Sequence, residues 1–323
     1  MRAVVAREFG PPGSFLLEER SLPDPGPGEV RIGIRAAGVS FVDVLVATGQ
    51  YQLKLPLPFT PGSEFAGMVA AVGPDAGLAI GDRVCASAFG GALAEAAVVP
   101  ARACVRIPDA MSFEEAAVFR VSYATAYHGL VQRGRLRPGE TVLVLGAGGA
   151  VGAASVQVAK ALAARVIGSA STEAKRALAL EMGADEVVDS GAAHWRDRIK
   201  ALTGGRGVDV VVDPVGGAAS EPAFRALAWE GRHLVIGFVA GIPKLAANLP
   251  LRKGAAIVGV DIRQFGERQP ALAAENLARL FDLYGEGRLR PKIGLRLPLE
   301  RFAEAMEAAA AGAGGGRIVL VPA

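Results

Sequence analysis

The chain has 323 residues, 51% of them hydrophobic, which suggests about two globular domains and argues against a disordered chain. Its net charge of +3 comes from scattered Lys and Arg residues without a block of like charges, which argues against nucleic-acid or membrane-surface binding. The two cysteines, Cys85 and Cys104, lie in no CxxC or CxxH pair, which argues against a cysteine-based zinc site, and a disulfide between them would be unusual in a reducing cytosol.

The expected compartment is the cytoplasm. The opening residues, MRAVVAREFG, have too short an apolar run for a signal peptide, and no later segment offers 18 apolar residues free of breakers. Residues 141–160 come nearest to an apolar span, but four glycines, Ser155 and Gln157 argue against a membrane helix.

The first 110 or so residues show the pattern of a β-rich domain. Short alternating runs such as EVRIGIRAAGV and AGMVAAVG are separated by turn clusters such as PDPGPGE and GPDAG, which predicts a compact barrel of short strands. At Ser112 the pattern changes to a helix start, because Ser112 and Glu115 have the spacing of a capping box.

From Thr141 the chain alternates between strand and helix patterns. Nearly all residues of the strands are apolar, as expected of a parallel sheet with both faces covered. The alternation predicts right-handed βαβ units in a doubly wound sheet, with helices over stretches such as 173–182 and 217–229. The tail from Ala271 shows two helical patterns and a last strand, GRIVLV. The predicted strands of the doubly wound sheet are 141–145, 165–169, 186–189, 208–213, 232–237 and 256–260.

A glycine-rich stretch, LGAGGAVG, joins the strand at 141–145 to the following helix pattern. Gly146, Gly149 and Gly152 form a GxxGxxG spacing, with a further glycine at Gly148. This strand–loop–helix context is the one in which backbone approaches a dinucleotide pyrophosphate at a helix N-terminus. The alternative is an ordinary glycine-rich turn, but the further β/α units favour nucleotide binding.

The end of the second strand indicates which nucleotide. A carboxylate there would bind the ribose 2′-hydroxyl of NAD. This chain instead has Ser169 and Ser171, followed by Lys175, which suit a 2′-phosphate and favour NADPH. The alternative is that Ser171 only caps the next helix and that Lys175 is solvated.

Several motifs together resemble the zinc-independent quinone oxidoreductases, the zeta-crystallin-like family of the medium-chain dehydrogenase/reductase superfamily. The resemblance covers essentially the whole chain and implies an α/β protein. A GroES-like β-barrel catalytic domain would span residues 1–112, completed by 264–323, and a Rossmann dinucleotide-binding domain would span 113–263. The motifs that carry the resemblance are GVSFVDVLVATGQY, PGSEFAGMVAAVG, IGDRV, YATAYHGL, LTGGRGVDVVVDPVGG and GGRIVLVP.

The same resemblance argues against a metal. Zinc-dependent members of the superfamily have a Cys where this chain has Ser40 and a His where it has Ser63, and they carry a four-cysteine lobe that is absent here. The remaining pair, Ser63 and Glu64, cannot complete a tetrahedral site. We therefore expect no metal site and a reaction in which the cofactor supplies the hydride.

The resemblance implies two sets of site residues. The catalytic or acceptor-side residues would be Ser40, Asp43, Tyr51 and Thr125. The NADPH-binding residues would be Gly146, Gly148, Gly149, Ala150, Val151, Gly152, Ser171, Lys175, Ser190, Gly237, Phe238, Val239 and Arg317.

Other polar and aromatic residues have simpler interpretations. We expect Glu64 to be structural, His128 to be a packing residue, and His194 and His233 to lie at the surface or at sheet ends. Trp195 and Trp229 would lie in the core or an interface.

Three charged residues depart from the family pattern and leave two interpretations open. Arg120, Asp261 and Arg263 could form surface ion pairs. Alternatively, they could form a charged wall for the acceptor, with Asp261 paired to one of the arginines.

These observations predict a zinc-independent NADPH-dependent quinone reductase that transfers hydride from the nicotinamide to a quinone. Two alternatives stay open: an NADPH-dependent reductase of activated C=C bonds in an enal, enone or enoyl thioester, and an NADPH-binding protein with little turnover. The apolar edge strand at 256–260 predicts a homodimer, because such an edge invites pairing with a second chain. The natural acceptor, the proton donor and the choice between one- and two-electron reduction are left open by the sequence.

Overall fold

The structure of the protein is a computed structural model that describes residues 1–322. The chain forms two compact units, one made of Met1–Val121 with the chain from Arg290 onward, the other of Ser122–Leu289. The second unit includes residues that the predicted boundary at 264 gives to the first domain. The reason is packing: Asn276 and Gln132 exchange hydrogen bonds of 3.0 and 3.1 Å, and Leu280 is fully buried.

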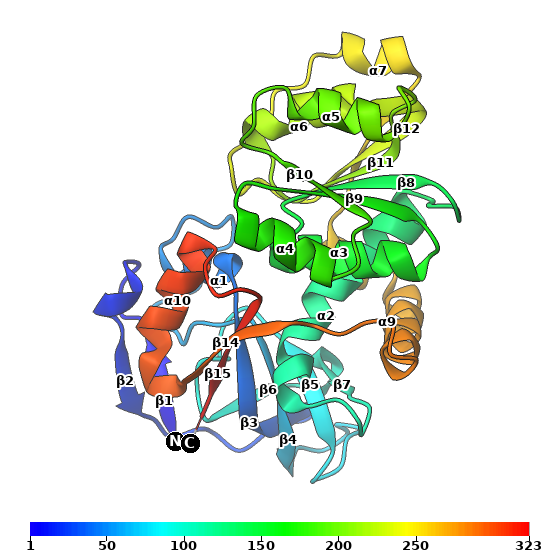
Figure 1. The fold of residues 1–323 in the computed structure, drawn as a ribbon. Coiled ribbons are helices and arrows are strands. Elements are labelled where there is room, and N and C mark those ends of the chain that lie inside the picture. Colours follow the sequence, from blue (N-terminus) through cyan, green and yellow to red (C-terminus); the bar gives the residue numbers. More distant parts are fainter. Residues whose placement is uncertain (323) are drawn as a thin grey trace. The chain divides into compact units, whose positions relative to one another are not determined.

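The first unit is built on a seven-stranded sheet. Its strands run in the order β14–β15–β3–β4–β5–β7, with β6 also paired to β3 (Figure 1). The alternation in EVRIGIRAAGV has its expected effect, because Val30, Ile32 and Ile34 all point into the core of this unit. The bounds are β3 (Glu29–Val39), β4 (Glu64–Val72), β5 (Arg83–Ser87), β6 (Ala96–Pro100), β7 (Cys104–Arg106), β14 (Ile293–Pro298) and β15 (Arg317–Val321), beside the separate pair β1 (Arg2–Val5) and β2 (Leu16–Glu19).

Two helices of this unit, α2 and α1, begin at a serine with an acidic residue three positions later. The predicted capping box is confirmed, since Ser112 Oγ accepts from the Glu115 N–H at 3.1 Å while Glu115 accepts from the Ser112 N–H. A second capping box joins Ser40 to Asp43 at the start of α1. The helices are α1 (Phe41–Ala47), α10 (Phe302–Ala311) and α2 (Phe113–Tyr127), whose last residues belong to the second unit.

The second unit is a doubly wound α/β structure, as predicted. Its six parallel strands run in the order β10–β9–β8–β11–β12–β13, so the chain reverses direction across the sheet between β8 and β11. Such a reversal leaves a crevice for ligands at the carboxyl ends of the central strands. The bounds are β8 (Thr141–Leu145), β9 (Arg165–Ala170), β10 (Glu186–Asp189), β11 (Val208–Asp213), β12 (Leu227–Val235) and β13 (Ala256–Gly259).

Helices cover both faces of this sheet. Figure 1 shows α3 and α4 on one face and α5 and α6 on the other. The single helix predicted at 217–229 is wrong, because β12 already begins at Leu227 and leaves room only for a 3-10 turn and the short α6. The helices are α3 (Ala150–Ala161), α4 (Glu173–Glu181), α5 (Trp195–Leu202), α6 (Ser220–Arg225), α7 (Asn248–Lys253), α8 (Ile262–Arg268) and α9 (Pro270–Gly285), with a π-helical segment at His128–Arg133.

Within residues 1–322, no helix has both the length and the apolar character needed to cross a membrane.

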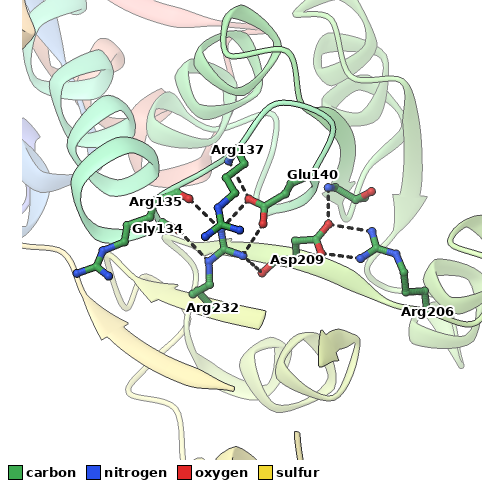
Figure 2. Close-up of polar contacts among 8 residues, drawn as sticks. Gly134, Arg135, Arg137, Glu140, Arg206, Asp209 and Arg232 are labelled. Carbon is green, nitrogen blue, oxygen red and sulfur yellow. Dashed lines mark hydrogen bonds and ion pairs between the residues drawn. The ribbon is translucent and has the colours of Figure 1, made fainter. Parts of the chain in front are cut away.

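A polar network ties the strands together away from their carboxyl ends (Figure 2). The guanidinium of Arg232 on β12 donates to both carboxylate oxygens of Glu140, at 3.0 and 2.7 Å, and to the carbonyl of Gly134 at 2.8 Å. Asp209 on β11 accepts from the Thr141 N–H at the start of β8. These contacts fix how the central strands begin, so they help to set the register of the sheet.

The network predicts unequal costs for two arginine substitutions. Arg232→Ala removes a side chain that is 19% exposed and leaves Glu140 partly buried without its cation, so the free energy of unfolding should fall by about 2–4 kcal/mol. Arg301→Ala, outside this network, is the control: its side chain is 54% exposed and that of its partner Glu304 is 48% exposed, so this ion pair should contribute less than about 1 kcal/mol. Urea unfolding of both variants measures the difference, and equal losses would contradict the role given to Arg232.

Candidate functional site

The glycine loop at the carboxyl end of β8 has the geometry of a close-approach turn. Gly146 has φ +58°, and a Cβ on Gly152 would lie 2.1 Å from the Gly146 carbonyl oxygen. Gly149 is the N-cap of α3, and no side chain caps it. The N–H groups of the first turn of α3, including those of Ala150 and Val151, are therefore open to an anionic ligand such as a pyrophosphate.

Lys175 lies directly against this loop. A Cβ on Gly148 would be 2.7 Å from Lys175 Cβ, so the two segments touch at backbone distance. Lys175 is half-buried in the first turn of α4, and the described residues include no ion-pair partner for it. Residues 169–171 include no acidic residue, and the turn between β9 and α4 offers the exposed hydroxyl of Ser171, followed by the cation of Lys175 in the first turn of α4. The residues therefore fit a dinucleotide with a 2′-phosphate.

The serines predicted around Lys175 have distinct places. Ser171 is exposed in the turn before α4. The alternative that it only caps this helix is wrong, because Thr172 is the residue that accepts the hydrogen bond from the Lys175 N–H. Ser190 lies beside the end of β9, where its N–H donates to the Ala170 carbonyl at 3.2 Å. Ser169 is fully buried, and its Oγ has no hydrogen-bond partner in the described structure.

The segment after β12 holds the predicted nicotinamide residues Gly237, Phe238 and Val239. The side chains of Phe238 and Val239 are 48% and 56% exposed, so they form an apolar surface at the carboxyl edge of the sheet. Thr125, the fourth predicted residue of this unit, is buried on α2 at 5% exposure. Nearby on the chain, His128 stacks on the Phe265 ring at 3.9 Å, which confirms that it is a packing residue.

In the first unit, a buried carboxylate joins two serine hydroxyls. Asp43, only 3% exposed, accepts hydrogen bonds from Ser40 Oγ and Ser63 Oγ, each at 2.7 Å, and from the Ser40 N–H at 2.7 Å. Burial raises the pKa of Asp43 although these hydrogen bonds and the charge of Arg317 oppose the rise. The structure thus brings the predicted residues Ser40 and Asp43 together and adds Ser63 to them.

Beside this group lies a second buried carboxylate, Glu64. It accepts from the Val121 N–H at 2.7 Å and lies 3.6 Å from the guanidinium of Arg317. Burial raises the pKa of Glu64 to about 7, with the Arg317 charge and the Val121 N–H acting in the opposite direction. Arg317 is thus engaged with Glu64 within the first unit, and its predicted contact with the cofactor stays a prediction.

These residues do not fit zinc. The resemblance to the family places Ser40 and Ser63 where zinc-dependent members have metal ligands, and in this structure both hydroxyls donate their protons to Asp43. Zinc prefers thiolate, imidazole and carboxylate ligands. Nowhere in residues 1–322 do three or more His, Cys, Asp or Glu side chains form a group suited to a metal ion.

The structure supports the interpretation of a surface ion pair for Arg263, which pairs with Glu267 on the exposed side of α8. Asp261 caps this helix by accepting from the Gln264 N–H and makes no ion pair with Arg120 or Arg263 in the described structure, so the alternative of a paired charged wall is wrong. His233 lies near the carboxyl end of β12, as expected of a residue at a sheet end, but it is fully buried. Tyr51, which the resemblance places with Asp43 among the acceptor-side residues, has its ring centroid 6.1 Å from that of Phe89.

The structure also places Arg120 and the two tryptophans, whose roles the sequence left open. Arg120 donates to the carbonyl of Ala103 at 2.5 Å inside the first unit. Trp195 packs against the core of the second unit, whereas Trp229 is 71% exposed.

Sequence reasoning also missed the role of Asp213 at the end of β11. Its carboxylate accepts from the N–H groups of Val215 and Gly216, at 3.0 and 2.8 Å, and so holds the turn that follows the strand. An acidic residue directly after the apolar run VDVVV, followed by two glycines, was the available signal. Its partner His233 has no comparable signal, because the two residues are far apart in the sequence.

Comparison with known proteins agrees with this architecture. The family model described as "Alcohol dehydrogenase GroES-like domain" matches residues 26–109, and the one described as "Zinc-binding dehydrogenase" matches residues 150–278. Quinone oxidoreductase-like protein 2 of Rattus norvegicus is 37% identical over 94% of this chain and 87% of its own length. Human quinone oxidoreductase is 33% identical over 99% of this chain and 98% of its own length.

A solved mycobacterial structure, determined in complex with NADPH, has the same fold. It is 32% identical to this chain, covers 100% of both chains and superposes with a TM-score of 0.92.

The raised pKa of Glu64 predicts a pH dependence of stability. Between the ordinary pKa of 4.5 and about 7, the folded state holds a proton that the unfolded state has lost, so the free energy of unfolding falls as the pH rises. Between pH 4.5 and 8, the free energy of unfolding of the wild type should fall by up to about 3 kcal/mol more than that of Glu64→Gln. Urea unfolding across this pH range measures the difference.

The exposed Glu304→Gln serves as the matched control and should run parallel to the wild type. Parallel curves for the wild type and Glu64→Gln would show that Glu64 is ionised throughout.

Proposed function

The chain belongs to the quinone oxidoreductase family of the medium-chain dehydrogenase/reductase superfamily, and we propose that it is a zinc-independent, NADPH-dependent reductase of quinones. The observation that carries the proposal is the contact between the glycine loop and Lys175, with no acidic residue at the end of β9. The NADPH complex of the mycobacterial relative supports the choice of cofactor.

In this proposal the second unit holds the cofactor. The N–H groups at the start of α3 bind the pyrophosphate, and Lys175 with Ser171 binds the 2′-phosphate, which a carboxylate at that place would repel. Gly237, Phe238 and Val239, together with Thr125, line the place of the nicotinamide. When bound, NADPH supplies the hydride that reduces the acceptor.

The first unit presents the acceptor-side residues, Ser40, Asp43 and Tyr51. With Asp43 ionised, both serine hydroxyl protons point to its carboxylate, and only their lone pairs remain for an acceptor molecule. Protonation of Asp43, favoured by its burial, frees one hydroxyl proton for the reduced acceptor. Solvent is the other proton source compatible with this arrangement.

The test is NADPH oxidation against a panel of quinones, enones and enoyl thioesters. Turnover with quinones and without enoyl thioesters is the expected result. Faster turnover of the activated C=C acceptors would support the alternative reductase activity. Tight NADPH binding without turnover of any acceptor would support a binding protein instead.

Lys175 should set the preference between the two nicotinamide cofactors. Lys175→Ala should weaken NADPH binding by about 1–3 kcal/mol, the range for a hydrogen bond to a charged group, and leave NADH binding unchanged. Fluorescence titration of both cofactors measures the two affinities. Arg263→Ala, which removes an exposed cation paired with Glu267, is the control for a general loss of positive charge. Equal affinities of the wild type for both cofactors would refute the assignment.

We also propose a homodimer joined at β13. This edge strand pairs only with β12 among the described strands, and Ile257 on it is 45% exposed. Ile257→Asp should convert the dimer to a monomer in light scattering at micromolar concentration, because it places a charge in the interface. Ile80→Asp, at a 68% exposed site on the first unit, should leave the dimer intact. A monomeric wild type would contradict the proposal.

A further inference from the structure

A fully buried histidine and aspartate lie directly under the segment that follows β12. His233 is 0% exposed and Asp213 is 1% exposed, and His233 Nε2 lies 2.9 Å from Asp213 Oδ2. The strands β11 and β12 are paired in parallel, which places both side chains near the carboxyl edge of the sheet. None of the roles described so far uses His233.

The hydrogen bonds define the state of the pair. The Asp213 carboxylate accepts four hydrogen bonds, from His233, the Val215 and Gly216 N–H groups, and Ser220 Oγ at 2.5 Å. These donors lower the pKa of Asp213 although burial alone would raise it. His233 Nδ1 is buried with no hydrogen-bond partner in the described structure, so the contact of Nε2 with Asp213 is the hydrogen bond by which the ring is held.

The Asp213 carboxylate stabilises the turn at 214–217 through its hydrogen bonds to Val215 and Gly216. This turn is hydrogen-bonded through its backbone to the segment 236–241. The backbone of Gly217 donates to Gly241 at 2.6 Å, and that of Ala240 donates to Val215 at 2.8 Å. Ile236 and Gly237 both donate to the Asp213 carbonyl. We call these four backbone hydrogen bonds the clasp.

The clasp leaves no space for side chains at two of its positions. A Cβ on Gly216 would lie 2.5 Å from the Gly241 carbonyl oxygen, and one on Gly217 would lie 2.3 Å from that of Ala240. A displacement of the turn would therefore be transmitted to 236–241 through backbone contacts. Between the two ends of the clasp lie Phe238 and Val239, whose exposed side chains depend on it for their position.

We infer that His233 is a positioning residue, which acts through Asp213 and the clasp to fix Gly237, Phe238 and Val239 where the nicotinamide ring binds. This inference rests on the proposed function, since it assigns the nicotinamide to that segment. In this arrangement the buried hydrogen bond between His233 and Asp213 does not touch the ligand. It sets the position of the apolar side chains that contact the nicotinamide ring.

Two substitutions separate the hydrogen bond from the bulk of the side chain. The amide nitrogen of Gln reaches the place of the imidazole Nε2, whereas that of Asn reaches only the place of Nδ1. His233→Asn should therefore lose the bond to Asp213, and His233→Gln should keep it. Both replace the ring that lies 5.8 Å from Phe224, so the loss of packing is shared by the two variants.

The first measurement needs no cofactor. Amide hydrogen exchange over 236–241 should become roughly tenfold faster in His233→Asn, the change expected for loss of one hydrogen bond to a charged group, and stay near the wild-type rate in His233→Gln. Equal exchange in the two variants would overturn the inference, whatever the protein binds.

The second measurement compares NADPH with 2′,5′-ADP, which lacks the nicotinamide half. His233→Asn should raise the Kd of NADPH about tenfold and leave that of 2′,5′-ADP unchanged, while His233→Gln restores NADPH binding. Unchanged 2′,5′-ADP binding also shows that the variant is folded. Equal losses for both ligands would indicate a general structural role and overturn the inference. A wild type that binds neither ligand would refute the proposed function, and the exchange measurement would still decide whether the clasp depends on His233.

Discussion

The parallel pairing of β8 with β11 is the constraint that positions the residues at both ends of these two central strands. At one end, Asp209 of β11 accepts from the Thr141 N–H that begins β8. At the other, a Cβ on Gly146 would lie 2.8 Å from Val215, so the glycine loop and the Asp213 turn are immediate neighbours. Because the strand order reverses at this pair, the glycine loop after β8 and the turn after β11 lie side by side at the edge of the sheet where such folds bind ligands.

The candidate residues of the two units differ in their electrostatics. The second unit offers backbone N–H groups and a half-buried lysine, which suits a highly charged anion. The first unit buries two carboxylates, Asp43 and Glu64, and balances them with hydroxyls, a backbone N–H and Arg317. Burial raises the pKa of both carboxyl groups, and it raises that of Glu64 to about 7, so Glu64 can hold a proton near neutral pH.

The sequence predicted the local features well and the long-range ones poorly. Five of the six predicted parallel strands lie within about one residue of their observed bounds, because apolar runs between turn signals are a local property. The capping box at Ser112 is local too. The burial of His233 depends instead on a partner that only the fold brings near, Asp213 on the neighbouring strand β11. The division of 217–229 was missed because β12 begins with the sequence LAWEG, whose residues do not alternate.

The close contact between Gly148 and Lys175 also constrains how cofactor preference can change. The glycine loop and the first turn of α4 meet at backbone distance, so the backbone of neither segment can change its path without moving the other. Exchange of the Lys175 side chain is compatible with this packing, whereas insertion of a residue before α4 is not. If the proposed preference for NADPH is to be changed to NADH, the change is thus confined to replacement of side chains on a fixed backbone.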